Sequence, residues 1–181
     1  MAVIILAGAP AVGKSALAEL IGSLRSRVAV VEVDDVRAMV RQPHVAPWEG
    51  EEGAAQYHLG ITSSCRLARG FMECGYEVLL VDVVPPETLG LYHAELLGLR
   101  LQTVLLRADS ATLLRRDSER ALARINKEAW QQRICALARQ LDAESESYDL
   151  VLDTGVLTRE ACAIEIGKLL DAYCETASPN S

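Results

Sequence analysis

The chain has 181 residues, half of them hydrophobic, and a formal net charge of −7 at pH 7. A chain of this length folds as one domain with a full hydrophobic core. The negative charge gives no general attraction to nucleic acid or to an anionic membrane surface. No apolar run approaches the roughly 20 residues needed to span a bilayer. Composition therefore favours a single globular domain, over about residues 1–175, that does not enter a membrane.

The five cysteines are scattered, odd in number and without a C-x-x-C pair. This pattern is typical of thiols in a reducing compartment rather than of a disulfide framework or a zinc site. The N-terminal apolar run has no basic region before it and is too short for a signal peptide. We therefore expect a cytoplasmic protein.

The first predicted element is a strand followed by a glycine-rich turn. Residues 2–7 are continuously apolar, and residues 8–15 read GAPAVGKS, with the spacing G-x-x-x-x-G-K-S. Apolar residues then recur at helical spacing. Strand, glycine-rich turn and helix in this order are the context of a phosphate-binding loop. The helix is expected to bury Leu17, Leu20, Ile21 and Leu24.

The chemistry of the turn supports nucleotide binding. Gly8 and Gly13 permit backbone angles that point successive N–H groups inward, and the helix N-terminus adds partial positive charge. Lys14 is expected to reach the outer phosphates, and the Ser15 hydroxyl to hold Mg²⁺. The residues expected to contact the nucleotide here are Gly8, Ala9, Pro10, Ala11, Val12, Gly13, Lys14, Ser15 and Ala16.

A second group of polar residues follows the next predicted strand. Residues 28–33 read VAVVEV, and this run rich in valine favours a strand covered on both faces. Asp34-Asp35-Val36-Arg37 comes next. Phosphoryl transfer to a hydroxyl needs a carboxylate to take the proton and cations to hold charge. Asp34 is the expected base and Arg37 an expected acceptor contact. Alternatively, Asp34 or Asp35 only caps a helix, and Arg37 pairs with Glu32 or Glu49.

The segment after this group is expected to cover the acceptor. Residues 42–53 contain prolines, glycines and three glutamates, which favours irregular structure. The covering segment is predicted over about residues 42–56, and His44 and Trp48 are its candidate substrate contacts. A helix is predicted from about residue 56 to residue 74.

The third predicted strand ends in an acid. Residues 77–82 contain four consecutive apolar residues and then Asp82, the form of a Walker B strand. Its carboxylate is expected to hold Mg²⁺ together with Ser15. An aspartate in this place is also a common turn former.

Three arginines at four-residue spacing follow the fourth predicted strand, residues 101–106. Asp109 or Ser110 is expected to cap the next helix, on which Arg116, Arg120 and Arg124 form one stripe. Like charges on a stripe repel, so the pattern favours a lid that closes over phosphates, at about residues 110–127. The alternative is a solvated basic face balanced by Asp117, Glu119 and Glu128.

The remaining elements complete an alternating pattern. A helix from residue 127, a fifth strand over residues 148–153 and a last helix capped by Thr158 are predicted, and residues 176–181 form a frayed tail. Alternating strands and helices predict a three-layer α/β fold with a five-stranded parallel sheet. Ligands bind at the carboxyl ends of such strands. This rule places residues 8–15, Asp34, Asp82 and Thr154 on one rim, with Thr154 bordering the adenine.

Taken together, these motifs resemble the small P-loop kinases. The nearest group contains the kinase domain of polynucleotide kinases, chloramphenicol phosphotransferase, gluconate kinase and zeta toxins. The resemblance implies ATP, Mg²⁺ and in-line transfer of the γ-phosphoryl group. It makes Asp34 the general base through a D-x-x-R motif shared with Arg37, and it maps an R-x-x-x-R lid motif onto Arg116 and Arg120. The lid lacks a long insertion, which argues against a nucleoside monophosphate as acceptor.

The expected function is transfer of phosphate from ATP to a hydroxyl of a small molecule. The acidic covering segment favours a neutral or cationic acceptor, such as a sugar, a nucleoside or an antibiotic. A 5′-hydroxyl polynucleotide kinase and a nucleotide-dependent switch protein are the alternatives. Sequence leaves open the acceptor, the choice between ATP and GTP, and whether the protein is a monomer or a homodimer.

Overall fold

The protein is described by a computed structural model over residues 2–119 and 127–172. The predicted lid arginines Arg120 and Arg124 and the predicted tail 176–181 lie outside the described residues. Among the described residues, no helix is both long enough and apolar enough to cross a membrane.

The centre of the fold is a five-stranded sheet in which every pairing is parallel. The spatial order is β2-β3-β1-β4-β5. This confirms the predicted five-stranded parallel sheet. The strands are β1 (Val3–Ala7), β2 (Val28–Glu32), β3 (Glu77–Val81), β4 (Leu101–Arg107) and β5 (Leu150–Asp153).

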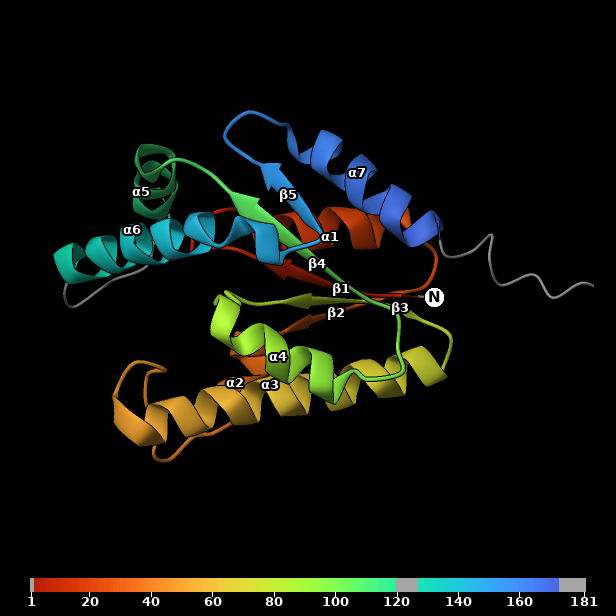
Figure 1. The fold of residues 1–181 in the computed structure, drawn as a ribbon, viewed down its shortest axis with the longest axis horizontal. Helices are drawn as coiled ribbons and strands as arrows, with labels where there is room; N and C mark the ends of the chain where they lie inside the picture. Colours follow the sequence, from red (N-terminus) through yellow and green to blue (C-terminus); the bar gives the residue numbers. More distant parts are fainter. Residues whose placement is uncertain (1, 120–126, 173–181) are drawn as a thin grey trace, which may run out of the picture.

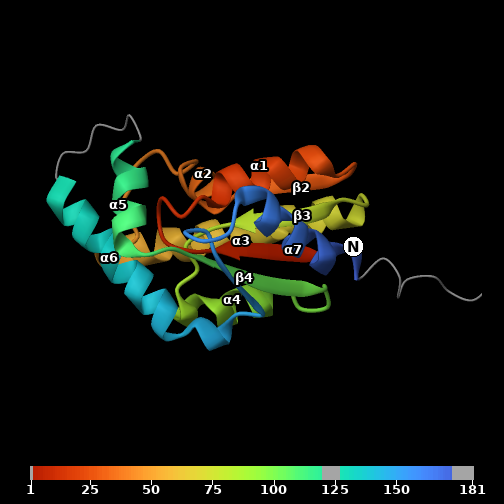
Figure 2. The same ribbon diagram turned by 90° about the horizontal axis from the view of Figure 1, so that it is seen from above.

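Helices cover both faces of the sheet, as expected for a three-layer fold (Figures 1 and 2). The helices α1 and α7 pack together on one face, and α3 and α4 on the other. Thr158 and Asp109 cap α7 and α5 by accepting backbone N–H groups at 3.2 and 2.9 Å, which confirms both predicted caps. The helices are α1 (Lys14–Leu24), α2 (Val33–Arg37), α3 (Gly50–Glu73), α4 (Pro86–Glu95), α5 (Ser110–Ser118), α6 (Lys127–Ala143) and α7 (Arg159–Asp171).

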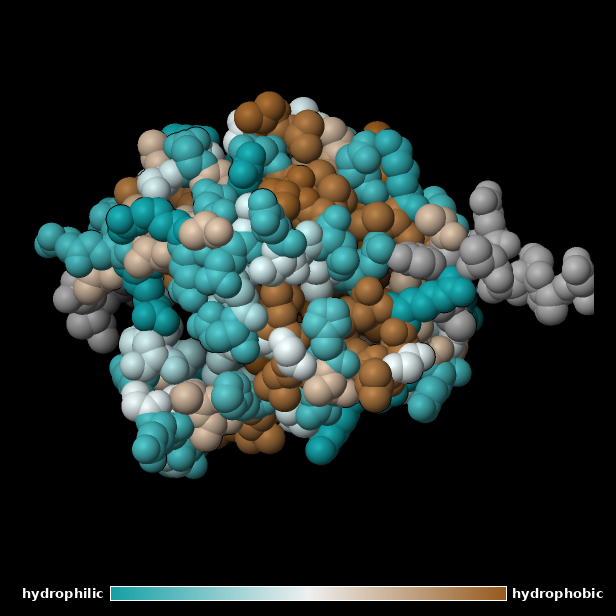
Figure 3. Space-filling model, in the orientation of Figure 1, coloured by the Kyte–Doolittle hydropathy of each residue, from teal (hydrophilic) through white to brown (hydrophobic). Residues whose placement is uncertain are grey.

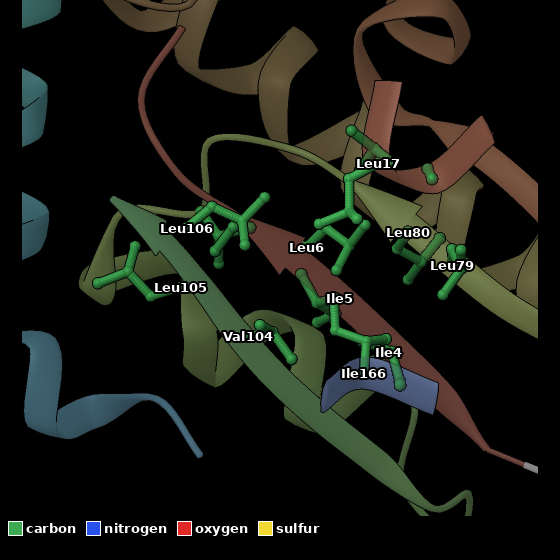
Figure 4. Close-up of a cluster of buried hydrophobic side chains, with 14 of the residues drawn as sticks. Ile4, Ile5, Leu6, Leu17, Leu79, Leu80, Val104, Leu105, Leu106 and Ile166 are labelled. Atoms are coloured by element: carbon green, nitrogen blue, oxygen red, sulfur yellow. The ribbon is translucent and has the colours of Figure 1, made fainter. Parts of the chain in front are cut away.

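The core is built around β1, the middle strand. All five of its residues are fully buried, and their side chains meet those of β3, β4, α1 and α7 (Figure 4). Burial on both faces explains why the β1 sequence is continuously apolar rather than alternating. The cluster drawn in Figure 4 includes Ile4, Ile5, Leu6, Leu17, Leu79, Leu80, Val104, Leu105, Leu106 and Ile166.

Three local predictions were wrong. β2 is an edge strand, paired only with β3, so that Val30 is 40% exposed instead of covered. Leu24 is the last residue of α1 and is 69% exposed. The helix predicted from residue 56 begins at Gly50, where Glu51 and Glu52 in the first turn complement the helix dipole.

The predicted covering segment is an irregular loop followed by the first turns of α3. We call residues 38–49 the covering loop. Gln56 is 4% exposed and fixes this loop on α3, because its side chain accepts the N–H of Val45 at 3.0 Å and donates to the Pro43 carbonyl at 2.8 Å. Gly53 lets the loop pass close to α3, since a Cβ there would overlap the carbonyl oxygen of Ala46.

We expect Gly53→Ala to destabilise the protein by about 1–3 kcal/mol, because the added methyl group forces the covering loop away from α3. The measurement is urea denaturation. Gly70→Ala is the matched control in the same helix, where a Cβ meets nothing within 4 Å. It is expected to stabilise by about 0.5–1 kcal/mol through helix propensity. Equal effects of the two substitutions would contradict the close packing at Gly53.

Candidate active site

The candidate site lies where the strands end, at the left of Figure 1 beside α5 and α6. The loop from β1 to α1 runs close to the ends of both neighbouring strands. Gly8 has φ +147 and donates its N–H to the Val83 carbonyl at 3.1 Å. No side chain fits at this position, because a Cβ would lie 2.5 Å from the Leu106 carbonyl oxygen. Gly13, with φ +104, starts α1. Glycine is therefore required at both ends of the loop.

Lys14 lies over this loop. Its Nζ donates to the carbonyl oxygens of Gly8 at 2.7 Å and Ala9 at 3.1 Å. A cavity of about 270 Å³ opens in front of the loop. We call it the phosphate cavity; it is lined by Pro10, Ala11, Gly13, Lys14, Ser15, Glu32, Asp34, Val81, Asp82, Val83 and Trp130.

Glu32 is a site residue that the sequence reasoning missed. It ends β2 and is half-buried in the wall of the phosphate cavity, which Ser15 also lines. Burial raises the pKa of Glu32, and the Ser15 hydrogen bond and the charge of Lys14 oppose this. The available signal was an acid at the carboxyl end of a predicted strand, yet Glu32 was considered only as an ion-pair partner for Arg37.

Asp82 is buried, with an exposed fraction of 4%. Its Oδ2 accepts the hydroxyl of Tyr57 from α3 and that of Tyr92 from α4, both at 2.7 Å. Burial raises the pKa of Asp82, and the two tyrosine hydrogen bonds counteract part of that rise. The tyrosines therefore fix this carboxylate at the end of β3 and join it to both helices on that face.

Asp34 and Arg37 lie together on α2. Asp34 is in the first turn, its side chain is 71% exposed, and its Oδ1 lies 3.5 Å from Arg37 Nε. Arg37 also donates to the Val45 carbonyl of the covering loop at 3.2 Å. The ion pair is thus with Asp34, and the alternatives of Glu32 and Glu49 were wrong. Asp35 is not the cap of α2 either, because it lies within the first turn, and the N-cap residue is Glu32, whose side chain makes no cap hydrogen bond.

A second cavity of about 540 Å³ lies between the covering loop, α3, α4 and α6. We call it the acceptor cavity. Asp34 and Asp82 line both this cavity and the phosphate cavity, so two carboxylates stand at the boundary between them. Its lining is Pro10, Asp34, Arg37, Pro47, Trp48, Ala54, Tyr57, His58, Asp82, Val83, Pro85, Glu87, Thr88, Trp130, Arg133, Leu137 and Gln140.

The covering loop supplies Trp48 to the acceptor cavity, but not His44, whose exposed ring lies 3.1 Å from the Val40 carbonyl. Three glutamates gave this part of the sequence its acidic character, but they do not line the described cavity. They are Glu49, Glu51 and Glu52.

A third cavity, of about 470 Å³, lies on the other side of the loop. We call it the Thr154 cavity. Arg116 of α5 lines it and donates to the carbonyl and hydroxyl oxygens of Thr154 at 2.7 and 2.9 Å and to the Val12 carbonyl at 3.2 Å. The structure thus brings Arg116 and Thr154 together, but Arg116 does not line the phosphate cavity.

A phosphate-binding loop between β1 and α1 of a parallel sheet, with acids at the ends of β2 and β3, defines the class of P-loop kinase folds. A family model described as chloramphenicol phosphotransferase-like protein matches residues 1–171. The chain therefore belongs to the chloramphenicol phosphotransferase-like family, which supports a nucleotide-dependent kinase. No curated protein matches the chain closely enough to count as a relative.

Solved structures share the fold at low sequence identity. Shikimate kinase from Acinetobacter baumannii, in complex with shikimate, superposes with a TM-score of 0.66 at 19% identity, covering 96% of this chain and 94% of that one. The tunicamycin resistance protein of Deinococcus radiodurans has a TM-score of 0.68 at 18% identity, covering 93% and 95%. The Mycobacterium tuberculosis APS kinase CysC, in complex with AMPPNP and APS, has a TM-score of 0.63 at 17% identity, covering 94% and 97%.

The buried carboxyl of Asp82 gives a prediction about pH. Because its pKa is raised above the ordinary value of 3.8, the folded state holds this proton more tightly than the unfolded state. Protonated Asp82 therefore contributes to the free energy of unfolding at low pH, and this contribution falls as pH rises above about 4. In Asp82→Asn this fall disappears, so the stability of the variant relative to wild type rises between about pH 4 and pH 7.

Urea denaturation at a series of pH values measures this difference. Asp35→Asn, at an exposed position of α2, is the control and is expected to leave the pH dependence of stability unchanged. A constant difference between wild type and Asp82→Asn across this pH range would contradict the raised pKa.

Proposed function

We propose that the protein transfers the γ-phosphoryl group of ATP to a hydroxyl of a small molecule in the cytoplasm. The observation that supports this most directly is the shared wall of two cavities. Asp34 and Asp82 line both the phosphate cavity and the acceptor cavity. The same carboxylates can therefore reach a phosphoryl group on one side of this boundary and a hydroxyl on the other. In-line transfer requires the two groups to be held this close together.

In this proposal the nucleotide lies along both sides of the phosphate-binding loop. Ala11 and Gly13 line the phosphate cavity and the Thr154 cavity alike, so one molecule can extend from one to the other. The phosphates bind the loop N–H groups and Lys14. The base occupies the Thr154 cavity, whose wall includes Arg116 and Thr154.

Asp34 is the proposed base. Its carboxylate is exposed to both cavities and is oriented by Arg37 at 3.5 Å. In the transfer step the acceptor oxygen forms a bond to the γ-phosphorus, the bond from that phosphorus to the ADP oxygen breaks, and the hydroxyl proton passes to Asp34. Arg37 neutralises part of the charge nearby.

The residues of the phosphate cavity fit Mg²⁺ held jointly with phosphates. Mg²⁺ prefers oxygen ligands and is bound in kinases through one or two protein groups. The phosphate cavity offers the Ser15 hydroxyl and the carboxylates of Glu32 and Asp82. Within the described residues no group of three or more acidic, histidine or cysteine side chains forms a metal centre by itself, which suits an ion that arrives with ATP. Bound Mg²⁺ would neutralise charge on the transferring phosphoryl group.

The acceptor is proposed to be a small molecule of the sugar, nucleoside or antibiotic type. The acceptor cavity is enclosed by the covering loop, α3 and α6, and its volume of about 540 Å³ is that of a drug-sized ligand site. The acidic residues that favoured a neutral or cationic acceptor do not line it, so the charge of that sequence segment does not define the acceptor.

The first experiment compares Asp34→Asn with Asp35→Asn. Acceptor-dependent ADP release from Mg²⁺–ATP is measured with a panel of sugars, nucleosides, antibiotics, hydroxy acids and 5′-hydroxyl oligonucleotides. Asp34→Asn is expected to lower kcat by about 100-fold or more, since it removes the proton acceptor, while ATP affinity stays the same. Asp35→Asn, one residue further along α2 and outside both cavities, keeps wild-type activity.

Full activity of Asp34→Asn would refute its role as base. Tight Mg²⁺–ATP binding without stimulation by any acceptor would refute the kinase proposal for these substrate classes. Release stimulated only by oligonucleotides would instead identify a polynucleotide kinase.

A second experiment concerns Glu32. Glu32→Gln removes a negative charge from the phosphate cavity but keeps the size of the side chain and an acceptor for Ser15. We expect the Mg²⁺ concentration for half-maximal activity to rise by about tenfold or more. Removing a residue that supports a bound metal commonly weakens metal affinity by this factor. Glu19→Gln, at an exposed position of α1, is the control. An unchanged Mg²⁺ requirement in Glu32→Gln would exclude Glu32 from the metal site.

A further inference from the structure

The acceptor cavity contains a positive charge that the proposed transfer does not use. Arg133 lies on α6 and lines the cavity, partly buried. Trp130, Arg133, Leu137 and Gln140 all line it, and their spacing of three or four residues places them on one face of α6. The outward face of the same helix is largely hydrophilic (Figure 3). The side chain of Arg133 is thus directed at the acceptor cavity.

The carboxylates of this cavity already have partners. Asp34 pairs with Arg37, Asp82 accepts the hydroxyls of two tyrosines, and Glu87 accepts the side-chain amide of Gln140 at 3.0 Å. None of these interactions involves Arg133.

Arg133 has only an aromatic partner within residues 2–119 and 127–172. Its guanidinium lies over the ring of Trp48, 3.7 Å from the ring centroid. Its Nε is buried and has no hydrogen-bond partner in the described part of the chain. Burial also lowers the pKa of Arg133, which reflects the loss of water around the charge. A guanidinium carries five N–H donors in a planar fork that matches a carboxylate, and this fork has no acceptor among the residues that the structure describes.

We propose that Arg133 binds an anionic group of the acceptor, so that the substrate is a hydroxyl-bearing molecule with one carboxylate. This inference rests on the proposed function and narrows its substrate class. A single uncompensated cation matches a single negative charge better than it matches a polyphosphate. The hydroxyl lies toward Asp34 at the boundary with the phosphate cavity, and the carboxylate lies toward Arg133.

The body of the acceptor is apolar and contains a ring. Trp48 and Trp130 stand at the cavity with ring centroids 6.3 Å apart, and Leu137 adds an aliphatic side chain. The Trp130 Nε1 donates to Asp117 at 3.1 Å, which anchors its ring on α5. A planar ring can pack against these indoles while its carboxylate reaches the guanidinium.

The two tryptophans also provide the measurement. They are the only tryptophans of the chain, and both line the acceptor cavity, so intrinsic fluorescence reports on its occupation without any turnover. The probes are 4-(hydroxymethyl)benzoate and 4-(hydroxymethyl)benzamide, which differ in charge but hardly in shape. Each is titrated into the protein in the presence of Mg²⁺ and ADP.

Wild-type protein is expected to bind the carboxylate at least about tenfold more tightly than the amide. A hydrogen bond to a charged group typically contributes a difference of this size. Arg133→Met keeps an unbranched apolar side chain against Trp48 and is expected to abolish this preference. Arg133→Lys keeps the positive charge and is expected to retain part of the preference for the carboxylate. Arg139→Met, at an exposed position of the same helix, leaves it unchanged.

Equal binding of the two probes by wild type, or a preference that survives Arg133→Met, would overturn the inference. Failure of the carboxylate to saturate the signal would overturn it as well. If Arg133 serves only to support Trp48, the preference is the same in wild type and Arg133→Met. These outcomes are distinct from failure of the kinase proposal, which appears as absent acceptor-dependent ADP release across the whole panel while the carboxylate preference persists.

Discussion

The close passage of the loop after β1 over the ends of β3 and β4 is the constraint on which the site depends. Gly8 donates to the Val83 carbonyl and lies so near the Leu106 carbonyl that no side chain fits. The loop thereby reaches the centre of the carboxyl edge, where all three cavities meet it. Pro10 lines the phosphate and acceptor cavities, while Ala11 and Gly13 line the phosphate and Thr154 cavities. One turn thus fixes the relative position of the three cavities.

The three carboxylates around the phosphate cavity occupy different environments, and this suits them to different tasks. Asp82 is buried and held by two tyrosines, Glu32 is half-buried beside Ser15, and Asp34 is exposed to both cavities. A fixed, buried carboxylate serves as a positioning group or metal ligand, whereas a proton acceptor must reach the substrate. The proposal that Asp34 is the base rests on this difference.

The acceptor cavity depends on contacts between parts of the chain that are distant in sequence. Gln56 fixes the covering loop on α3, Arg37 bonds the same loop from α2, and Arg133 of α6 stacks on its Trp48. Asp117 of α5 in turn anchors Trp130. The described part of α5 is therefore connected to the acceptor cavity through Trp130 of α6.

The sequence by itself determined the phosphate-binding loop, the five parallel strands and the caps at Asp109 and Thr158. These features follow from local spacing, glycine conformation and hydrophobic periodicity, which a single segment carries in full. The sequence also indicated the rim shared by Asp34 and Asp82, because strand ends of a parallel sheet meet at one edge. The exposure of β2 at the edge was missed, since strand order is not a property of one strand.

Only the tertiary structure decided which charges face the acceptor. The glutamates near Trp48 in sequence do not line the cavity, while Arg133, some 80 residues further along, lines it with no carboxylate among its described partners. Glu32 likewise became a site residue only when β2 was placed beside β3 and its carboxylate met Ser15. The charge of a segment is a sum over its residues, whereas the charge of a cavity depends on where each side chain points.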